Sequence, residues 1–146
     1  QSVLPHFNNG QTILLVHNTA MPEEDIVFAN NYANDNNLSL VYCLCPNANL
    51  YIENKMPPIE ALMRNKADIV LGTDSYSSNW QLSMVTEVAT LHERFSQIPL
   101  NILLQWATLN GAKALRRDEL LGSFEKGKRP GVVIIQDGLS KSERLL

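Results

Sequence analysis

Three apolar runs, each followed by a polar loop and a helix pattern, limit the folds open to this chain more than any other feature. The runs occupy residues 12–16, 38–44 and 67–73. Each is apolar almost without interruption, which is typical of a parallel strand buried on both faces. The residues at their ends, His17, Leu44 and Asp74, are 27 and 30 residues apart. This spacing predicts an α/β fold made of successive parallel βα units, in a barrel or a doubly wound sheet.

The remaining elements are expected between and after these strands. Pro22 followed by acidic residues marks the start of the first helix, because acids are favourable at the positive end of the helix dipole. Residues 45–49 are expected to form a loop, and the β-branched run at 132–135 is expected to form one more strand. The other expected helices cover residues 59–66, 80–95, 101–106 and 109–116.

The composition is that of a globular domain and argues against several classes of protein. The chain has 146 residues, 45% of them apolar and 18% charged, and a net charge of −3. It lacks a basic block interleaved with aromatic residues, so nucleic-acid binding is not expected, and no apolar run is long enough for a membrane span.

The two cysteines, Cys43 and Cys45, are expected to be buried free thiols on opposite faces of their strand, which indicates a reducing, cytoplasmic compartment. A zinc site at this pair would need a second pair that the sequence lacks.

Asp74 is the candidate functional residue with the clearest placement, because it follows a buried strand and opens the polar loop 75–79. A carboxylate at the carboxyl end of a parallel strand is where α/β enzymes place metal ligands and catalytic groups. The alternative is a helix cap or a turn residue, since the loop is rich in cap-forming side chains. His17 is either an acid–base group at a strand end or a side chain that only donates to a nearby carbonyl. His92 is expected to pack on its helix face, and His6 to lie at the surface.

Five motifs occur in a fixed order along the chain. They are Leu15-Val16-His17-Asn18, Cys45-Pro46-Asn47-Ala48-Asn49-Leu50, the run from Leu71 to Asn79, residues 107–115, and residues 122–128 with 132–135. Together they resemble the sixth, seventh and eighth barrel strands, the next helix and the return to a small accessory β-domain in the amidohydrolase superfamily. The resemblance is to the branch that contains guanine deaminase, S-adenosylhomocysteine deaminase and the triazine chlorohydrolases.

This resemblance implies a partial (β/α) barrel with about three parallel βα units, followed by C-terminal helices and a short terminal strand. Residues 1–118 would be the C-terminal part of a metal-dependent hydrolase barrel, and residues 119–146 the segment returning toward the accessory β-domain. A closed barrel takes about 250 residues, and the HxH and HxxE motifs of the family's first and fifth strands are absent here. We therefore expect the C-terminal portion of a longer enzyme, inactive alone.

For function, the resemblance implies hydrolysis of a C–N or C–Cl bond on a purine, pyrimidine or triazine-like ring, by a deaminase or chlorohydrolase. In this family a divalent metal, Zn or Fe in the full-length enzyme, activates water, and this fragment is expected not to bind it tightly. Asp74 would be the metal ligand and proton acceptor, and His17 the acid–base or water-orienting group. Ser78 and Asn79 would contact the substrate or support the ligands.

An alternative follows from Leu44, which stands where the family often has histidine. The chain would then be a non-catalytic interaction or scaffold module of the same ancestry. The expected partners are a small heterocyclic substrate and a second copy of the chain, because a partial parallel sheet exposes an edge and apolar side chains that favour self-association.

Overall fold

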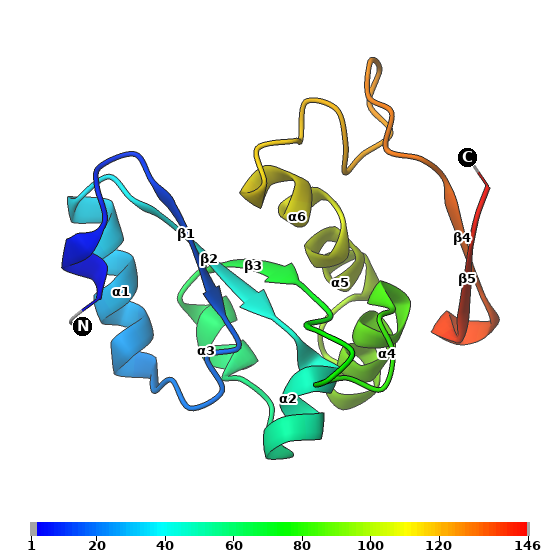
Figure 1. Ribbon diagram of the computed structural model, residues 1–146, viewed down its shortest axis with the longest axis horizontal. Helices are drawn as coiled ribbons and strands as arrows, with labels where there is room; N and C mark the ends of the chain where they lie inside the picture. The colour runs from blue at the N-terminus through cyan, green and yellow to red at the C-terminus, as the bar shows by residue number, and fades with distance from the viewer. Residues whose placement is uncertain (1–2, 146) are drawn as a thin grey trace.

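The computed structural model describes residues 3–145, and its central element is a parallel three-stranded sheet with helices packed around it (Figure 1). In chain order the elements are η1 (Leu4–His6), β1 (Thr12–Val16), α1 (Glu23–Asp35), β2 (Ser39–Leu44), α2 (Pro46–Glu53), α3 (Ile59–Arg64), β3 (Asp68–Leu71), α4 (Met84–Arg94), α5 (Leu100–Ala107), α6 (Leu109–Ala114), β4 (Val133–Gln136), η2 (Asp137–Leu139) and β5 (Lys141–Arg144). No helix in this part of the chain is long and apolar enough to cross a membrane.

The sheet has the order β1-β2-β3, and both pairs of neighbours are parallel. Thr12 pairs with Ser39, so β1 and β2 start level, whereas Val41 pairs with Asp68, so β3 starts two residues further along the sheet. The predicted α/β class with three parallel βα units is confirmed. Because parallel strands point the same way, their carboxyl ends lie along one edge, where the loops after β1, β2 and β3 come together.

One face of the sheet is packed against the helices and forms the apolar core. Alternate residues of β2, which are Leu40, Tyr42 and Leu44, belong to this core, as do Ile69 and Leu71 of β3. Tyr42 is fully buried, and its hydroxyl donates to Asn30 Oδ1 of α1 at 3.0 Å. Burial raises the pKa of Tyr42 to about 12, so the hydroxyl remains a donor at neutral pH.

The opposite face of the sheet is much more open. Leu14 and Val16 of β1 are 42% and 48% exposed, although both are large apolar residues. At the amino ends of the strands this face borders a cavity of about 430 Å³, which α5 and α6 also line. Asn110 of α6 donates to the carbonyl of Ile69 at 2.8 Å and so satisfies a polar group of the edge strand β3. The sheet is therefore covered on one face, whereas on the other face β1 is exposed and Val41 and Val70 are buried.

Some elements differ from the sequence-based expectation. The expected loop 45–49 is mostly helical, because Pro46 occupies the first turn of α2, where its missing N–H costs nothing. The helix expected from residue 80 begins only at Met84, where the hydroxyl of Ser83 accepts from the amide of Thr86. His92, expected to pack, is exposed, whereas His6 lies at the surface as predicted.

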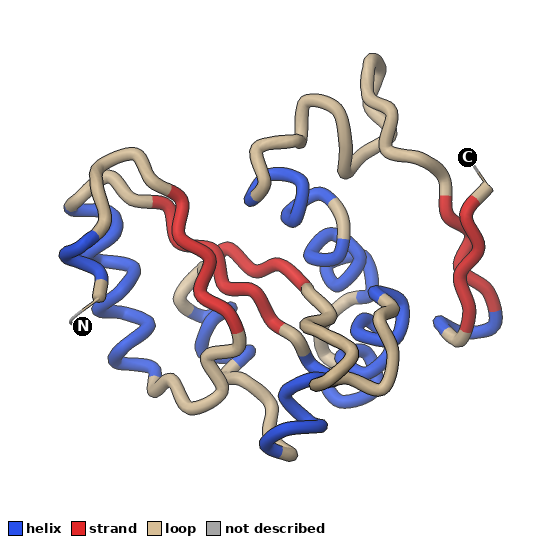
Figure 2. Tube along the Cα trace, in the orientation of Figure 1, coloured by secondary structure: helices blue, strands red, loops and turns tan. Residues whose placement is uncertain are grey.

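The C-terminal segment forms an antiparallel hairpin that lies apart from the parallel sheet (Figure 2). Its first strand, β4, confirms the predicted terminal strand, whereas β5 was not expected. Leu139 in the turn between them is buried in the core and attaches the hairpin to α4.

The hydrogen bond of Tyr42 gives a first test of the core. Replacing Tyr42 with Phe should lower the free energy of unfolding by about 1 kcal/mol, because Asn30 loses its donor in a partly buried place. Urea denaturation followed by circular dichroism would measure the change. Tyr76→Phe, at an exposed tyrosine, is the control and should stay within about 0.5 kcal/mol of the wild type. Equal effects of the two substitutions would contradict this description of the core.

Candidate active site at the carboxyl edge of the sheet

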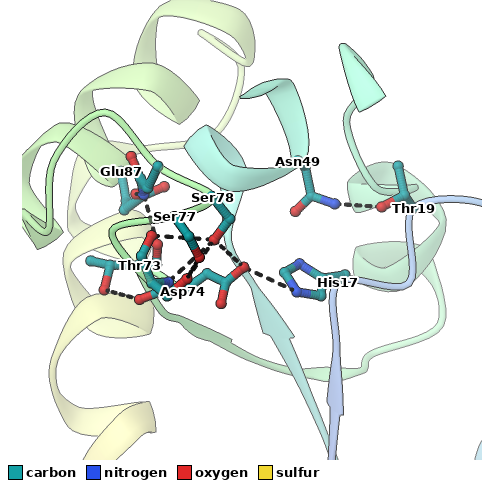
Figure 3. Close-up of polar contacts among 10 residues, drawn as sticks. His17, Thr19, Asn49, Thr73, Asp74, Ser77, Ser78 and Glu87 are labelled. Carbon is teal, nitrogen blue, oxygen red and sulfur yellow. Dashed lines mark hydrogen bonds and ion pairs between the residues drawn. The ribbon is translucent and has the colours of Figure 1, made fainter. Parts of the chain in front are cut away.

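His17 and Asp74 lie at the carboxyl ends of the two outer strands and face each other across the end of β2 (Figure 3). The Nε2 atom of His17 is 3.6 Å from the Oδ2 atom of Asp74, and both side chains are about one-third exposed. Adjacent strands are about 4.8 Å apart, so each side chain must lean over β2 to reach the other. The structure thus brings together the two residues that the sequence singled out.

Both residues adopt an unusual backbone conformation. The φ angle is 68° at His17 and 58° at Asp74, in the left-handed region. Non-glycine residues enter this region uncommonly, although His, Asn and Asp do so more often than others. In each case the chain turns sharply as it leaves its strand, and the turn directs the side chain along the sheet edge.

The loop after Asp74 is held by its own hydroxyl groups. Ser78 Oγ donates to Asp74 Oδ2 at 2.7 Å, and Ser75 Oγ is 2.8 Å from Ser77 Oγ and 3.0 Å from Ser78 Oγ. Asp74 does not cap α4, because the cap of that helix is Ser83. The carboxylate therefore belongs to the loop and to His17 rather than to a helix end.

A fully buried carboxylate, that of Glu87 on α4, connects this loop to the one after β2. Glu87 Oε1 accepts from Asn79 Nδ2, and Oε2 accepts from the backbone amide of Asn47, both at 2.8 Å. Asn79 Nδ2 also donates to the carbonyl of Thr73 at 2.6 Å, directly before Asp74. Thr90 on the same helix donates to Asn47 Oδ1 at 2.7 Å. Glu87 thereby fixes both loops to one helix.

Burial raises the pKa of Glu87, and the hydrogen bonds from Asn47 and Asn79 oppose that shift without cancelling it. The charged carboxylate loses hydration inside the protein, which outweighs the stabilisation by its donors. The ionisation of Glu87 is therefore linked to folding.

A second polar contact joins the loop after β1 to α2. Asn49 Nδ2 donates to Thr19 Oγ1, and both residues are buried. The other amide atom of this side chain, Asn49 Oδ1, is buried and has no hydrogen-bond partner among the described residues. Buried acceptors are normally satisfied, so this oxygen is a free acceptor at the edge.

The side chains of His17 and Asp74 provide some, but not all, of the ligands that a divalent cation needs. Asp74 Oδ2 accepts from Ser78, whereas no hydrogen bond in residues 3–145 engages Oδ1 of the same carboxylate. Carboxylate oxygen and imidazole nitrogen are both ligands that zinc accepts. Within the described residues, however, no three His, Cys, Asp or Glu side chains converge to hold a metal. His17 and Asp74 fit two positions of a coordination shell, and further ligands would have to come from elsewhere.

Sequence reasoning missed Glu87 and its contact with the amide of Asn47. Glu87 falls on the apolar face of its helix beside Val88, both buried, and a charged residue on such a face is a signal of a buried polar network. Leu44, taken as the loss of a polar active-site group, is fully buried in the core between sheet and helices.

Comparison with known proteins identifies the family. The model of the amidohydrolase family matches residues 4–144, and the chain belongs to this family. A 5-methylthioadenosine/S-adenosylhomocysteine deaminase of Saccharophagus degradans is 31% identical over 133 residues, which are 86% of this chain and 28% of that protein. The resemblance read from the five motifs is thus confirmed, and this chain spans less than one-third of that relative's length.

Solved structures agree with this assignment. An adenosine deaminase from Xanthomonas campestris with bound zinc superposes with a TM-score of 0.67 at 29% identity, covering 82% of this chain and 28% of that one. The aminofutalosine deaminase of Helicobacter pylori in complex with methylthio-coformycin has a TM-score of 0.59, also at 29% identity, over 81% of this chain and 28% of that one. The members that this chain matches here are hydrolases of the deaminase type.

Glu87 predicts a specific dependence of stability on pH. Below its ordinary pKa of 4.5 the carboxyl is protonated in both states. As the pH rises above this value, the unfolded chain releases the proton while the folded chain retains it, so the contribution of Glu87 to stability falls until the raised pKa is passed. Urea unfolding at a series of pH values should show this decline in the wild type but not in Glu87→Gln.

At neutral pH, Glu87→Gln should also destabilise the chain by about 1–3 kcal/mol, because the amide nitrogen of Gln would face one of the two donors. Glu93→Gln removes a charge from an exposed place on the same helix and serves as the matched control. An identical pH profile in the wild type and Glu87→Gln would contradict the assigned role of burial.

Proposed function

We propose that this chain forms the C-terminal part of the catalytic barrel of a hydrolytic deaminase that acts on an amino-substituted purine-type ring. The reaction would replace the exocyclic amine with oxygen, consuming one water and releasing ammonia. The observation that carries the proposal is the close pairing of His17 and Asp74 at the carboxyl edge of the sheet, in a chain of the amidohydrolase family. The names of the matched deaminases support the purine-type substrate.

In this proposal Asp74 and His17 have distinct roles. Asp74 Oδ1 would hold a divalent cation, zinc or iron, and when bound this cation supplies a water of lowered pKa. Asp74 Oδ2, hydrogen-bonded to Ser78, would accept the proton that the attacking water loses. His17 Nε2 would orient that water and pass a proton toward the departing amine.

Ser78 and Asn79 would support these residues from the loop. Ser78 fixes one oxygen of the carboxylate, and Asn79 fixes the carbonyl directly before Asp74. Glu87 would act through Asn79, as a positioning residue that touches neither substrate nor cation. Such supporting groups commonly contribute 10–100-fold to metal affinity or activity.

We further propose that residues 1–118 complete their barrel with strands from the remainder of a longer polypeptide, and that residues 119–146 lead to an accessory β-domain. The open face of the sheet, with Leu14 and Val16 exposed, supports the first part. The separate hairpin β4–β5 supports the second. In isolation this chain would bind zinc weakly and have no turnover, because two donors do not complete a metal site.

The decisive experiment uses the full-length polypeptide that contains this segment. Asp74→Asn should reduce turnover of 5-methylthioadenosine, S-adenosylhomocysteine, adenosine or guanine by about a thousandfold, since a lost charge contact to a catalytic metal costs several kcal/mol. Asp68→Asn, an exposed aspartate at the start of β3, is the control. Bound zinc, measured by atomic absorption, should fall only in Asp74→Asn. Full activity and zinc content in Asp74→Asn would overturn the proposal.

The open sheet face also predicts self-association of the isolated chain. Apolar side chains on an uncovered face and an unpaired strand edge favour contact with a second copy. Light scattering should detect dimers that dissociate in Val16→Lys, because a charge on the exposed apolar edge strand resists burial. Met63→Lys, at an exposed apolar residue of α3, is the control. A monomer at high concentration would contradict this prediction.

A further inference from the structure

The thiols of Cys43 and Cys45 converge on one point of the sheet, contrary to the expectation that they face opposite sides. They are separated by a single residue, and residues two apart in a strand point to the same face. A Cβ atom on Gly72 of the neighbouring strand would lie 3.0 Å from Cys43 Sγ and 3.3 Å from Cys45 Sγ. Both sulfurs thus border the same small space above Gly72.

Space, rather than backbone conformation, accounts for the glycine at this position. Gly72 is not among the glycines with a positive φ angle, so its backbone suits any residue. A side chain there would meet both sulfurs at once, at distances shorter than ordinary contacts. The glycine therefore makes room for the two sulfurs, which lie together above its backbone.

The two thiols also interact with each other. A hydrogen bond with the Cys45 thiol lowers the pKa of Cys43, whereas the pKa of Cys45 is raised by that hydrogen bond and by burial. Cys43 is therefore the better nucleophile of the pair. Cys45 lies close enough to form the second bond to the same reagent. Cys43 is partly exposed and Cys45 is buried, so a reagent would meet Cys43 first.

We propose that Cys43 and Cys45 form a two-sulfur binding site for soft, thiophilic centres, with trivalent arsenicals as the best-matched class. Soft ligands such as thiolates select soft metals and metalloids, and an arsenical with two exchangeable positions needs two neighbouring sulfurs and no third ligand. With phenylarsine oxide, both S–H bonds break and two As–S bonds form. The arsenic-bound oxygen leaves with both protons as one water, and no oxidation state changes.

The site lies at the carboxyl end of β2, between the strands that lead to His17 and to Asp74. Cys43 ends the pairing of β2 with β1, and the amide of His17 donates to its carbonyl at 3.0 Å. Asp74 is near enough to raise the pKa of both cysteines by its charge. An arsenical held here would occupy the floor of the candidate active site, yet its binding depends on the sulfurs alone and not on the proposed deaminase function.

The test uses this chain and phenylarsine oxide. Native mass spectrometry should show one adduct per chain with the loss of one water, and both cysteines should then resist alkylation by iodoacetamide. Because these are the only cysteines, Cys43→Ser and Cys45→Ser should each weaken binding by about 100-fold, the usual loss when one of two linked contacts is removed. A wild-type adduct that leaves one cysteine open to alkylation would overturn the proposal, as would unchanged binding in both variants.

A pair of alanine variants tests the role of the glycine. Gly72→Ala places a methyl group between the sulfurs and should weaken binding by at least about tenfold. Gly111→Ala is the matched control, because a Cβ atom at Gly111 meets nothing within 4 Å. Equal binding by the two folded alanine variants would show that the shared space is not the site. If Gly72→Ala does not fold, the two serine variants decide the question.

Discussion

The buried carboxylate of Glu87 is the contact on which the geometry of the candidate site depends. It joins two loops that follow different strands to the same helix, α4. Glu87 accepts one hydrogen bond from each, through Asn47 and Asn79. A buried charge without such partners would be very costly, so Glu87 depends on both loops keeping these positions. The position of Asp74 then follows from that of Asn79, which holds the carbonyl directly before it.

The two faces of the sheet have different roles, and alternate residues of each strand belong to one face or the other. Tyr42 and Leu44 face the helices and supply apolar burial. Cys43 and Gly72, displaced by one position, face the other way, and the Cys43 sulfur lies against Gly72. Leu44 therefore packs in the core, although it stands beside residues of the candidate site. A single step along a strand separates a packing residue from one that is open to ligands.

Much of the fold could be predicted from the sequence, because parallel strands that are buried on both faces have continuous apolar sequences. The meeting of His17 and Asp74 follows from the same reasoning, since ends of parallel strands share an edge. The strand Lys141–Arg144 could not be found, because its polar side chains are all exposed and only its pairing with β4 defines it. Glu87 was missed because its partners lie 40 and 8 residues away, and no local pattern reports such contacts. Pro46 is a signal for the start of a helix. The asparagines that follow it nevertheless favoured the prediction of a loop.

The left-handed backbone at His17 and Asp74 narrows the amino acids that evolution can place there. Asparagine and glycine accept this conformation readily, whereas β-branched residues resist it. A lineage that lost the chemistry would therefore be expected to drift first toward asparagine or glycine at these two positions. Threonine or valine at either position would indicate that the backbone there no longer has a positive φ angle.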